Sequence, residues 1–421
     1  MRIVVTGLGC VCPLGVGVEY CWKSLLAGKS GIVNFSQQNP FEGRTKSEVL
    51  ARVPTGELPY LYNDTDPFID QKKYGRFVRY ALLSAREALI DSAWQNLSEE
   101  QKDYTGVSIS TGLGALDMIE AKALSLANIP AGDLALSNYG PFYIPASIPN
   151  MGAGHVSIAF GLRGPNRSVN AACASGLYAI EDGAAMIRSG DAKVVVAGAS
   201  ESAICLAAFG GFDAMTALSR KYNDTPQLAS RPYSVGRDGF VFSEGAGIVI
   251  LEDFEHAKAR NAKIYAEYLA TGMTADANHI SSPSGTGAER AIRAALNKSG
   301  ISPEQVDHIN SHATSTPIGD QSEIQSFRNA FGKHLLKTKI SALKSSFGHA
   351  LCAASGVESI FAIKSIQEQV VPPTLNIKDV DVFAADLDIP AQAQNHRINY
   401  LLKTSFGFGG TNAATIFAKY P

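Results

Sequence analysis

Short apolar segments alternate with amphipathic ones along the whole chain. The apolar segments are rich in β-branched residues and bounded by glycine, as buried strands of α/β sheets are, and they include residues 2–6, 107–110, 194–197 and 246–251. Between them, apolar residues recur with helical spacing over residues 77–94, 152–160, 177–189, 287–299, 320–331 and 355–367. This alternation predicts an α/β protein with at least one covered sheet.

The length of the chain and a repeated pattern predict two halves. A chain of 421 residues is longer than one ordinary core accommodates. A strand followed by a turn and a helix occurs at residues 170–189 and again at 340–367. We therefore expect two similar halves, residues 1–255 and 256–421. Because no low-complexity linker divides them, we expect them to share a large interface.

Composition and charge narrow the class of protein. Hydrophobic residues make up 45% of the chain and charged residues 18%, which is typical of a well-buried globule. The net charge of -2 provides no strong field for nucleic acid or an anionic membrane surface. No apolar run approaches the roughly 20 residues of a membrane span, and residues 1–9 predict a strand rather than a cleavable presequence. We expect a cytoplasmic protein.

Six cysteines without a secretory signal predict free thiols in a reducing compartment. Cys10 and Cys12 lack the spacing and the second ligand pair of a zinc site, so no metal is expected. The segment from Thr6 to Gly9 predicts a glycine turn after the first strand. It does not predict a dinucleotide site, because the third glycine is missing and Pro13 disturbs helix entry.

Cys173 has the setting of a reactive cysteine. It lies in a run of small residues, 170–176, directly before the helix predicted from Leu177. Unpaired N–H groups and the helix dipole at such a terminus stabilise a thiolate, and small neighbours let a substrate approach. A buried structural cysteine is the alternative at this position.

Two histidines follow predicted strands in similar surroundings. His312 comes after the strand at 306–309, and His349 comes after the strand at 339–343, each beside glycine or small hydroxyl residues. Both histidines are placed to donate hydrogen bonds to one oxyanion. Either alone would be structural in most proteins, but with Cys173 they indicate a Cys-His-His site.

These motifs make the chain similar to the β-ketoacyl-[acyl-carrier-protein] synthases of the thiolase-like superfamily, and most of all to the elongating type II enzymes of bacterial and mitochondrial fatty acid synthesis. The resemblance covers nearly the whole chain in the expected order, through residues 4–9, 170–176, 237–241, 310–320, 344–349 and 405–412. It implies a five-layer α/β/α/β/α fold and a homodimer. It also leaves open a mitochondrial matrix or plastid location, if a presequence was removed.

The resemblance implies a decarboxylative Claisen condensation. An acyl group moves from acyl carrier protein to Cys173, and malonyl-carrier protein then loses CO2 and attacks the thioester, giving a 3-oxoacyl-carrier protein. No cofactor is implied, because the substrates are carried on the phosphopantetheine arm of acyl carrier protein. A ketosynthase subunit of a type II polyketide or related specialised pathway stays open as the alternative.

The resemblance also implies roles for the residues around the nucleophile. The backbone N–H groups of Cys173 and Phe408 would form the oxyanion hole of acyl transfer, while His312 and His349 would hold the malonyl thioester. Lys344 and Glu358 match a supporting ion pair.

Further residues are assigned to substrate and carrier in the same way. Phe240 and Phe408 resemble gates on the malonyl and acyl sides, Thr314 and Thr316 match residues that bind the pantetheine amides, and Leu113 and Tyr143 would line the acyl tunnel. The Tyr143 hydroxyl predicts a shorter or more polar tunnel end. The acidic carrier would dock on the basic residues Lys72, Lys73 and Arg76.

Among the positions that depart from the family pattern, two bear directly on the site. Phe347 stands where threonine is common, which predicts a bulkier apolar wall beside His349. Thr404 replaces an asparagine that often precedes Ser405, so the monovalent cation site of some relatives, in the region of Asn310 and Glu358, does not carry over to this chain.

Overall fold

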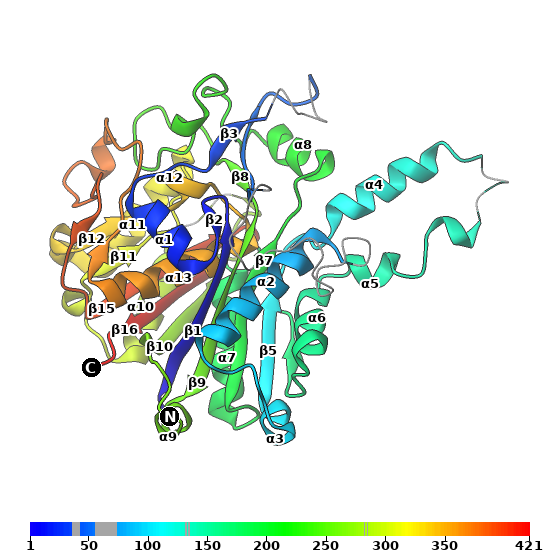
Figure 1. Ribbon diagram of the computed structural model, residues 1–421. Helices are drawn as coiled ribbons and strands as arrows, with labels where there is room; N and C mark the ends of the chain where they lie inside the picture. The colour runs from blue at the N-terminus through cyan, green and yellow to red at the C-terminus, as the bar shows by residue number, and fades with distance from the viewer. Residues whose placement is uncertain (36–42, 55–73, 131–132, 134, 282, 284) are drawn as a thin grey trace.

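A computed structural model describes the chain except for residues 36–42, 55–73, 131–132, 134, 282 and 284. Its helices and strands form five layers, α/β/α/β/α, which confirms the expected fold class (Figure 1). One sheet layer runs in the order β1 (Ile3–Cys12), β9 (Gly245–Asp253), β7 (Val194–Glu201), β5 (Thr105–Ser110) and β6 (Asn166–Arg167). The other runs in the order β10 (Ala266–Ala275), β16 (Thr411–Ala418), β15 (Tyr400–Gly407), β11 (His308–Asn310) and β12 (Lys339–Ser341). Antiparallel pairing of β1 with β10 joins the two layers.

Two helices, α7 (Ser175–Ser189) and α13 (Cys352–Glu368), form the central layer between the sheets. Helix α13 contacts β7 and β9 on one side and β15 on the other, and it is buried from Cys352 to Ile366. A helix that is apolar or small on every face is typical of such a position. A Cβ atom on Gly247 would lie 2.3 Å from the backbone carbon of Gly356, so glycine is required where β9 meets α13.

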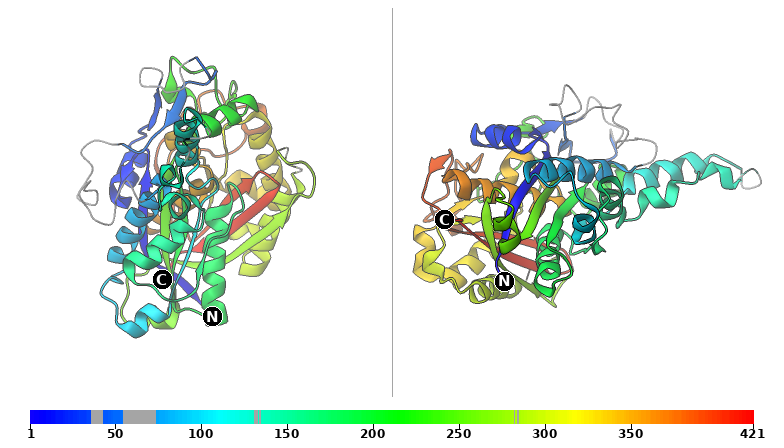
Figure 2. Two further views of the ribbon diagram at one scale, coloured as in Figure 1. Left: turned by 90° about the vertical axis from the view of Figure 1, so that its right-hand side faces the viewer. Right: turned by 60° about the horizontal axis from the view of Figure 1, so that its bottom comes forward.

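Four helices cover the outer faces of the sheets (Figure 2). Helices α2 (Arg76–Asp91) and α6 (Met151–Phe160) pack on the first sheet layer, and α10 (Thr286–Ser299) with α11 (Pro317–Phe331) covers the second. The remaining helices and paired strands are β2 (Gly15–Val16), α1 (Val18–Leu26), β3 (Ile32–Asn34), β4 (Val49–Ala51), α3 (Glu99–Asp103), α4 (Leu116–Ala127), α5 (Tyr143–Ser147), α8 (Leu206–Ala214), β8 (Phe242–Ser243), α9 (Phe254–Ala259), α12 (Lys344–Phe347), β13 (Val370–Val371) and β14 (Gln394–Asn395).

The glycine turn predicted after the first strand is wrong. Strand β1 continues to Cys12, and its glycines allow α2 to approach the sheet. A Cβ atom on Gly7 would lie 2.2 Å from the carbonyl oxygen of Ala88. A Cβ atom on Gly9 would lie 1.9 Å from the carbonyl oxygen of Ser84. The glycines therefore serve close helix packing, a requirement that the sequence of one segment does not reveal.

The six predicted helices are confirmed with small shifts at their ends. The segment expected at 77–94 is α2, which stops at Asp91 shortly before Ala93 adopts φ +53°. The division into halves at residue 255 stays a prediction, and α9 (Phe254–Ala259) spans it. Among the described residues, no helix is both long and apolar enough to cross a bilayer.

Candidate active site

Cys173 lies just before α7, in a strained backbone segment. The preceding residue, Ala172, has φ +47°, a conformation that costs a non-glycine residue about 1 kcal/mol or more. The carbonyl oxygen of Cys173 accepts hydrogen bonds from the hydroxyl of Ser355 at 3.1 Å and from that of Ser405 at 2.9 Å. Two segments from the C-terminal part of the chain thus hold the cysteine in place.

The thiol of Cys173 is protonated in the resting state. Burial raises its pKa to about 11, against the opposing effects of Lys344 and of the backbone N–H groups of Phe408 and Cys173 itself. The helix terminus does favour the anion, as predicted from the sequence, but desolvation in the enclosed site outweighs it. A thiolate at rest was therefore the wrong expectation, and a base must accept the proton when the sulfur reacts.

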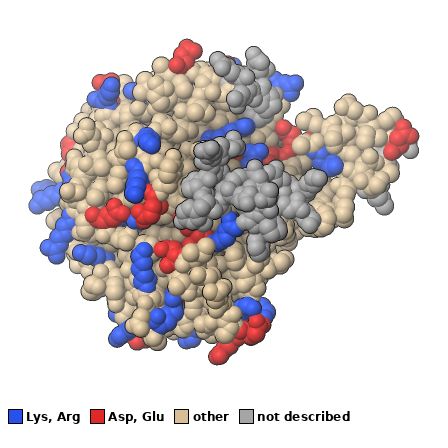
Figure 3. Space-filling view, in the orientation of Figure 1, with Lys and Arg blue, Asp and Glu red and all other residues tan. Residues whose placement is uncertain are grey.

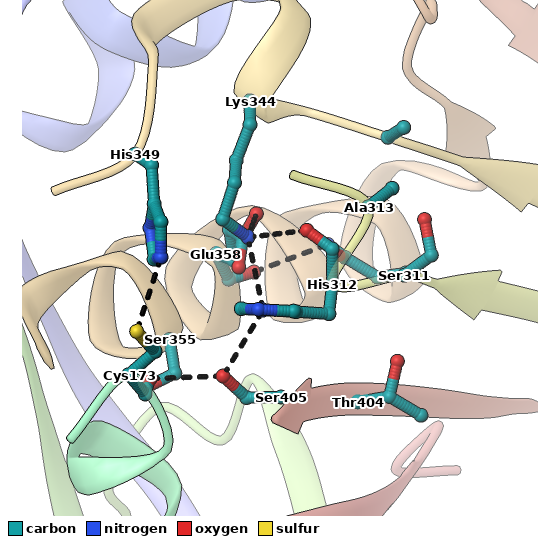
Figure 4. Close-up of polar contacts among 12 residues, drawn as sticks. Cys173, Ser311, His312, Ala313, Lys344, His349, Ser355, Glu358, Thr404 and Ser405 are labelled. Carbon is teal, nitrogen blue, oxygen red and sulfur yellow. Dashed lines mark hydrogen bonds and ion pairs between the residues drawn. The ribbon is translucent and has the colours of Figure 1, made fainter. Parts of the chain in front are cut away.

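His349 is the side chain nearest to this thiol among the polar contacts of the site. Its Nε2 atom lies 3.1 Å from Sγ of Cys173 (Figure 4). The ring lies edge to face with Phe240, with centroids 5.3 Å apart. Gly348 before it has φ +73°, and a Cβ there would lie 2.8 Å from the carbonyl oxygen of Val241. Burial and the charges of Lys344 and Lys403 lower the pKa of His349 well below its usual value, so the imidazole is neutral.

His312 faces His349, with ring centroids 5.4 Å apart. Its backbone N–H donates to Oε1 of Glu323 at 2.8 Å. The Lys344 ammonium lies 3.4 Å from Nδ1 of His312 and donates to the His312 carbonyl oxygen at 2.6 Å. Because an ammonium only donates, Nδ1 accepts and the ring proton belongs on Nε2. Burial, followed by the charge of Lys344, lowers the pKa of His312 well below normal, so this ring is also neutral.

The supporting pair is present and fully buried. Lys344 lies 2.7 Å from Oε1 of Glu358, which projects from α13. The other oxygen of the same carboxylate, Oε2, lies 2.9 Å from the ammonium of Lys403 on β15. The sequence thus predicted one ion pair, and the structure contains two ammonium groups on one carboxylate.

A cavity of about 570 Å³ opens onto these groups. Cys173, His312 and His349 all line it, and so do the predicted substrate residues Leu113, Thr314, Thr316, Phe240 and Phe408. The hydroxyl oxygens of Thr314 and Thr316 lie 2.9 Å apart. Tyr143 lies on α5 and is not among the residues that line the cavity, so its contact with an acyl chain stays a prediction.

Two further expectations have different outcomes. Phe347 does not form a wall beside His349: it is fully buried and packs on Phe361 in the core, with centroids 6.0 Å apart. Of the predicted docking residues, Lys72 and Lys73 lie outside the described residues. Arg76 begins α2 and pairs with the buried Glu244 at 3.4 Å, so part of its charge is already neutralised.

Several residues of the site had no signal in the sequence. Glu323 holds the His312 loop, Ser405 contacts Cys173, and Lys403 reaches Glu358. Glu201 accepts from the N–H groups of Gly112 at 2.8 Å and of Leu113 at 3.2 Å, at the cavity wall. Ser405 belongs to the recognised 405–412 segment, and Glu323 and Lys403 lie close to recognised segments in the chain, but the sequence did not indicate their contacts with the site.

A second group of cysteines lies away from the cavity. The sulfur atoms of Cys10, Cys12 and Cys21 lie within 4.8 Å of one another, and all three side chains are fully buried in the hydrophobic core around α1 and β1. The sequence had placed Cys10 and Cys12 together without Cys21. Their packing among apolar side chains is typical of structural thiols.

Comparison with known proteins agrees with this geometry. Residues 1–257 match the family model for the N-terminal domain of β-ketoacyl synthase, and residues 265–378 match that for its C-terminal domain. The chain is 42% identical to the mitochondrial 3-oxoacyl-[acyl-carrier-protein] synthase of Arabidopsis thaliana, over 99% of this chain and 93% of that protein. It is 41% identical to 3-oxoacyl-[acyl-carrier-protein] synthase 2 of Rhizobium meliloti (strain 1021), over 100% and 99%.

Solved structures show the same fold. A β-ketoacyl synthase from Burkholderia phymatum STM815 superposes with a TM-score of 0.89 at 30% identity, with both chains covered completely. A type II polyketide ketosynthase, determined in complex with its acyl-carrier protein, superposes with a TM-score of 0.87 at 32% identity, over 100% of this chain and 99% of that one. A partly exposed cysteine beside His349, a second histidine that faces this ring, the two family matches and these relatives lead to one conclusion: the chain belongs to the β-ketoacyl synthase family.

Proposed function

We propose that this protein is a 3-oxoacyl-[acyl-carrier-protein] synthase that elongates an acyl chain held on Cys173 with a malonyl unit. The observation that carries the proposal is the placement of Cys173, His349 and His312 around one cavity, with Nε2 of His349 3.1 Å from the sulfur. The names of the curated relatives support fatty acid elongation over the polyketide alternative.

In the first half-reaction, the Cys173 thiol attacks the acyl thioester of the carrier protein. The S–H proton moves to Nε2 of His349 as the new C–S bond forms, and it then passes to the pantetheine sulfur as the old C–S bond breaks. We assign stabilisation of the tetrahedral oxyanion to the backbone N–H groups of Cys173 and Phe408; their effect in lowering the pKa of the Cys173 thiol supports this assignment.

In the second half-reaction, the neutral histidines bind the malonyl thioester oxygen. Nε2–H of His312 donates to this oxygen, and His349 donates to it in its Nε2–H tautomer, as the carboxylate leaves as CO2 and its electrons form the enolate. The enolate carbon attacks the Cys173 thioester, the C–S bond breaks, and the thiolate that leaves takes up one proton from water through the adjacent ring of His349. The products are the 3-oxoacyl-carrier protein and free thiol, which matches the neutral state of both rings.

We also propose a homodimer, built on an arm that leaves the main body of the protein (Figures 1 and 2). Helix α4 in this arm has no buried residue, although Ile119 and Leu124 are apolar and α5 adds Ile144. Charged side chains are sparse on the face of the arm seen in Figure 3. This 12-residue helix packs on the body at its start, where Leu116 and Met118 are partly buried, but Leu124 further along is exposed, and exposed apolar patches mark interfaces. A second copy would cover the arm and bring Tyr143 into a packed environment.

The carrier protein and the compartment follow from the reaction. Every substrate is proposed to arrive on acyl carrier protein, as the names of the relatives indicate for those proteins. No cofactor is needed for either half-reaction as written, because the malonyl thioester itself takes up the electrons that decarboxylation releases, as an enolate, and the other bond changes are proton transfers and acyl transfers to or from a thioester. The protein would work wherever malonyl-carrier protein is made, which fits the expected cytoplasmic location and also the organellar alternative.

Intact-mass spectrometry tests the proposal directly. Acyl-carrier protein should add one acyl group to the wild-type chain, and malonyl-carrier protein should then remove it as a 3-oxoacyl product. Cys173→Ala should do neither, while the control Cys205→Ala, which removes a buried thiol outside the cavity, should retain both. Condensation by Cys173→Ala would overturn the proposal.

A further inference from the structure

Lys403 is a fully buried lysine that no motif of the chain accounts for. It lies within β15, and its ammonium is close to the carbonyl oxygen of Ser311, the residue before His312. Burial of a charge costs several kcal/mol unless it is paired and hydrogen-bonded. Lys344 already pairs with Glu358 at 2.7 Å, so Lys403 adds a second positive charge to a carboxylate that has a partner. If the pair of Lys344 and Glu358 were purely structural, it would not need the additional charge of Lys403.

The ammonium of Lys403 is surrounded by oxygen atoms from three separate segments. These are Oε2 of Glu358 at 2.9 Å, the carbonyl oxygen of Thr404 at 2.5 Å, and the carbonyl oxygen of Ser311 at 3.4 Å. A set of carbonyl and carboxylate oxygens is the environment that proteins give to hard cations. Lys403 therefore occupies the kind of site that a bare monovalent cation takes.

Each of these oxygens belongs to a segment that positions a reacting group. Ser311 precedes His312 in the chain. Thr404 precedes Ser405, whose hydroxyl bonds to the carbonyl oxygen of Cys173 at 2.9 Å and lies 3.4 Å from Nδ1 of His312. Glu358 also holds Lys344, which contacts His312 (Figure 4). One cation thus connects the His312 loop, α13 and the strand that ends beside the nucleophile.

The same charge acts on both histidines. Lys403 is among the groups that lower the pKa of both histidines, after burial and Lys344 for His349, and after burial, Lys344 and His349 for His312. A positive charge beside the rings keeps them neutral, and neutral rings donate N–H to an enolate oxygen without forming a buried imidazolium.

Resting on the function proposed above, we propose that Lys403 is a positioning residue that acts as a tethered monovalent cation. Its ammonium holds the His312 loop against Glu358 and makes malonyl decarboxylation independent of free Na+ or K+. The absence of the asparagine that often precedes Ser405 in relatives agrees with this inference, because the chain provides its own cation at that point.

Replacement of the side chain tests the proposal. Lys403→Ala removes the ammonium and leaves space for an ion, whereas the control Lys403→Met fills the space without a charge. Malonyl decarboxylation is measured in choline chloride and after exchange to KCl or NH4Cl at equal ionic strength. Acylation of Cys173 is followed separately by intact mass.

We expect Lys403→Ala to lose about 10- to 100-fold of its decarboxylation rate in choline chloride, as for removal of a group that orients the reacting residues. KCl or NH4Cl should restore most of it. Lys403→Met should show the loss without the recovery, and wild type should be insensitive to the salt. Acylation should change little in all three proteins.

The pH profile gives a second readout. Burial lowers the pKa of Lys403 to about 8, while the other charged groups that face it, Glu358 from α13, Glu323 from α11 and Lys344 from α12, act in both directions. The lysine is charged below this pKa and neutral above it. Wild-type decarboxylation should therefore fall above about pH 8, whereas Lys403→Ala with K+ should remain active to higher pH, because K+ does not titrate.

Three results would overturn the inference: a wild-type rate for Lys403→Ala in choline chloride, an equal response of Lys403→Ala to choline and potassium, or full activity of folded Lys403→Met. Should Lys403→Ala not fold, Lys403→Met decides the question, since it preserves most of the side-chain volume. Failure of wild type to decarboxylate malonyl-carrier protein would instead contradict the proposed ketosynthase function.

Discussion

At the scale of single residues, the two histidines differ in what they contact. Nε2 of His349 faces the sulfur of Cys173, whereas His312 is fixed through Nδ1 by Lys344 and through its backbone by Glu323. Both rings are neutral, yet only His349 is placed to take the thiol proton. Two residues that looked equivalent in the sequence therefore have different roles in the proposed cycle.

Substitution separates these roles. His312→Ala should reduce malonyl decarboxylation by about 10²–10⁴-fold, the usual contribution of a positioned proton donor, and should leave acylation of Cys173 close to the wild-type rate. His349→Ala should reduce both steps. Pre-steady-state acylation and CO2 release measure the two separately, with the exposed His334→Ala as control. Equal loss of acylation in both variants would contradict the assignment.

Glu201 is a buried carboxylate whose charge lowers stability. Burial raises its pKa from 4.5 to about 7, against the N–H groups of Gly112 and Leu113. The pKa of Glu201 is higher in the folded state than in the unfolded state. The stabilisation that results from keeping this carboxyl group protonated is therefore complete below pH 4.5 and is lost as pH rises through 7.

Glu201→Gln removes this titration. Between pH 5 and pH 8, the free energy of unfolding of wild type should fall by up to about 3 kcal/mol relative to the variant. This value follows from the pKa shift of Glu201, because each pKa unit corresponds to about 1.36 kcal/mol. Urea unfolding of both proteins at the two pH values, at one protein concentration, measures the difference. Parallel pH dependence in the two proteins would show that Glu201 does not titrate in this range.

At the scale of elements, glycine decides how close helices come to the sheets. Gly9 of β1 faces the backbone of α2, where a methyl group would lie 1.9 Å from the carbonyl oxygen of Ser84. A Cβ atom built on Gly211 of α8 would have no neighbouring atom within 4 Å outside its own helix backbone. The two glycines are the same residue type, but only at Gly9 does the surrounding structure exclude a side chain.

Alanine substitution should reveal that contrast. Gly9→Ala should destabilise the protein by about 3 kcal/mol or more, because backbone atoms must move apart to relieve the overlap. Gly211→Ala should stabilise it by about 0.5–1 kcal/mol, as alanine does within a helix. Thermal and urea denaturation measure both, and a neutral Gly9→Ala would show that β1 and α2 can separate at no cost.

At the scale of the whole molecule, the protruding arm differs from the body in its exposed apolar side chains, which a partner would cover. Leu124 on α4 is 61% exposed and Ile144 on α5 is 60% exposed, while the body of the protein buries almost all large apolar side chains of its strands. Such exposure is costly for an isolated chain and is relieved by association.

A charge on the arm should therefore prevent association. Leu124→Glu should convert a dimer into monomers and reduce condensation, while Val382→Glu, which places the same charge at a site that is 86% exposed, should leave the dimer intact. Sedimentation velocity across a range of concentrations measures the change. A dimeric Leu124→Glu, or a monomeric wild type, would contradict the proposed interface.

The sequence by itself determined the fold class, the main helices and the residues Cys173, His312 and His349. Periodicity and short motifs depend on residues that are neighbours in the chain, so they can be recognised from the sequence alone. The glycine turn at Gly7 and Gly9 was predicted wrongly because its cause, the backbone of α2, lies about 80 residues away in the chain.

Only the tertiary structure decided the chemistry around those three residues. Burial raises the pKa of Cys173 more than the groups that favour the anion lower it, and several of these groups, such as Lys344 and Phe408, are far from Cys173 in the chain. The contacts of Lys403 and Glu323 arise where separate strands and helices meet, so no local pattern could indicate them. Local sequence thus specifies which groups are present, and long-range packing fixes their charge, their orientation and their partners.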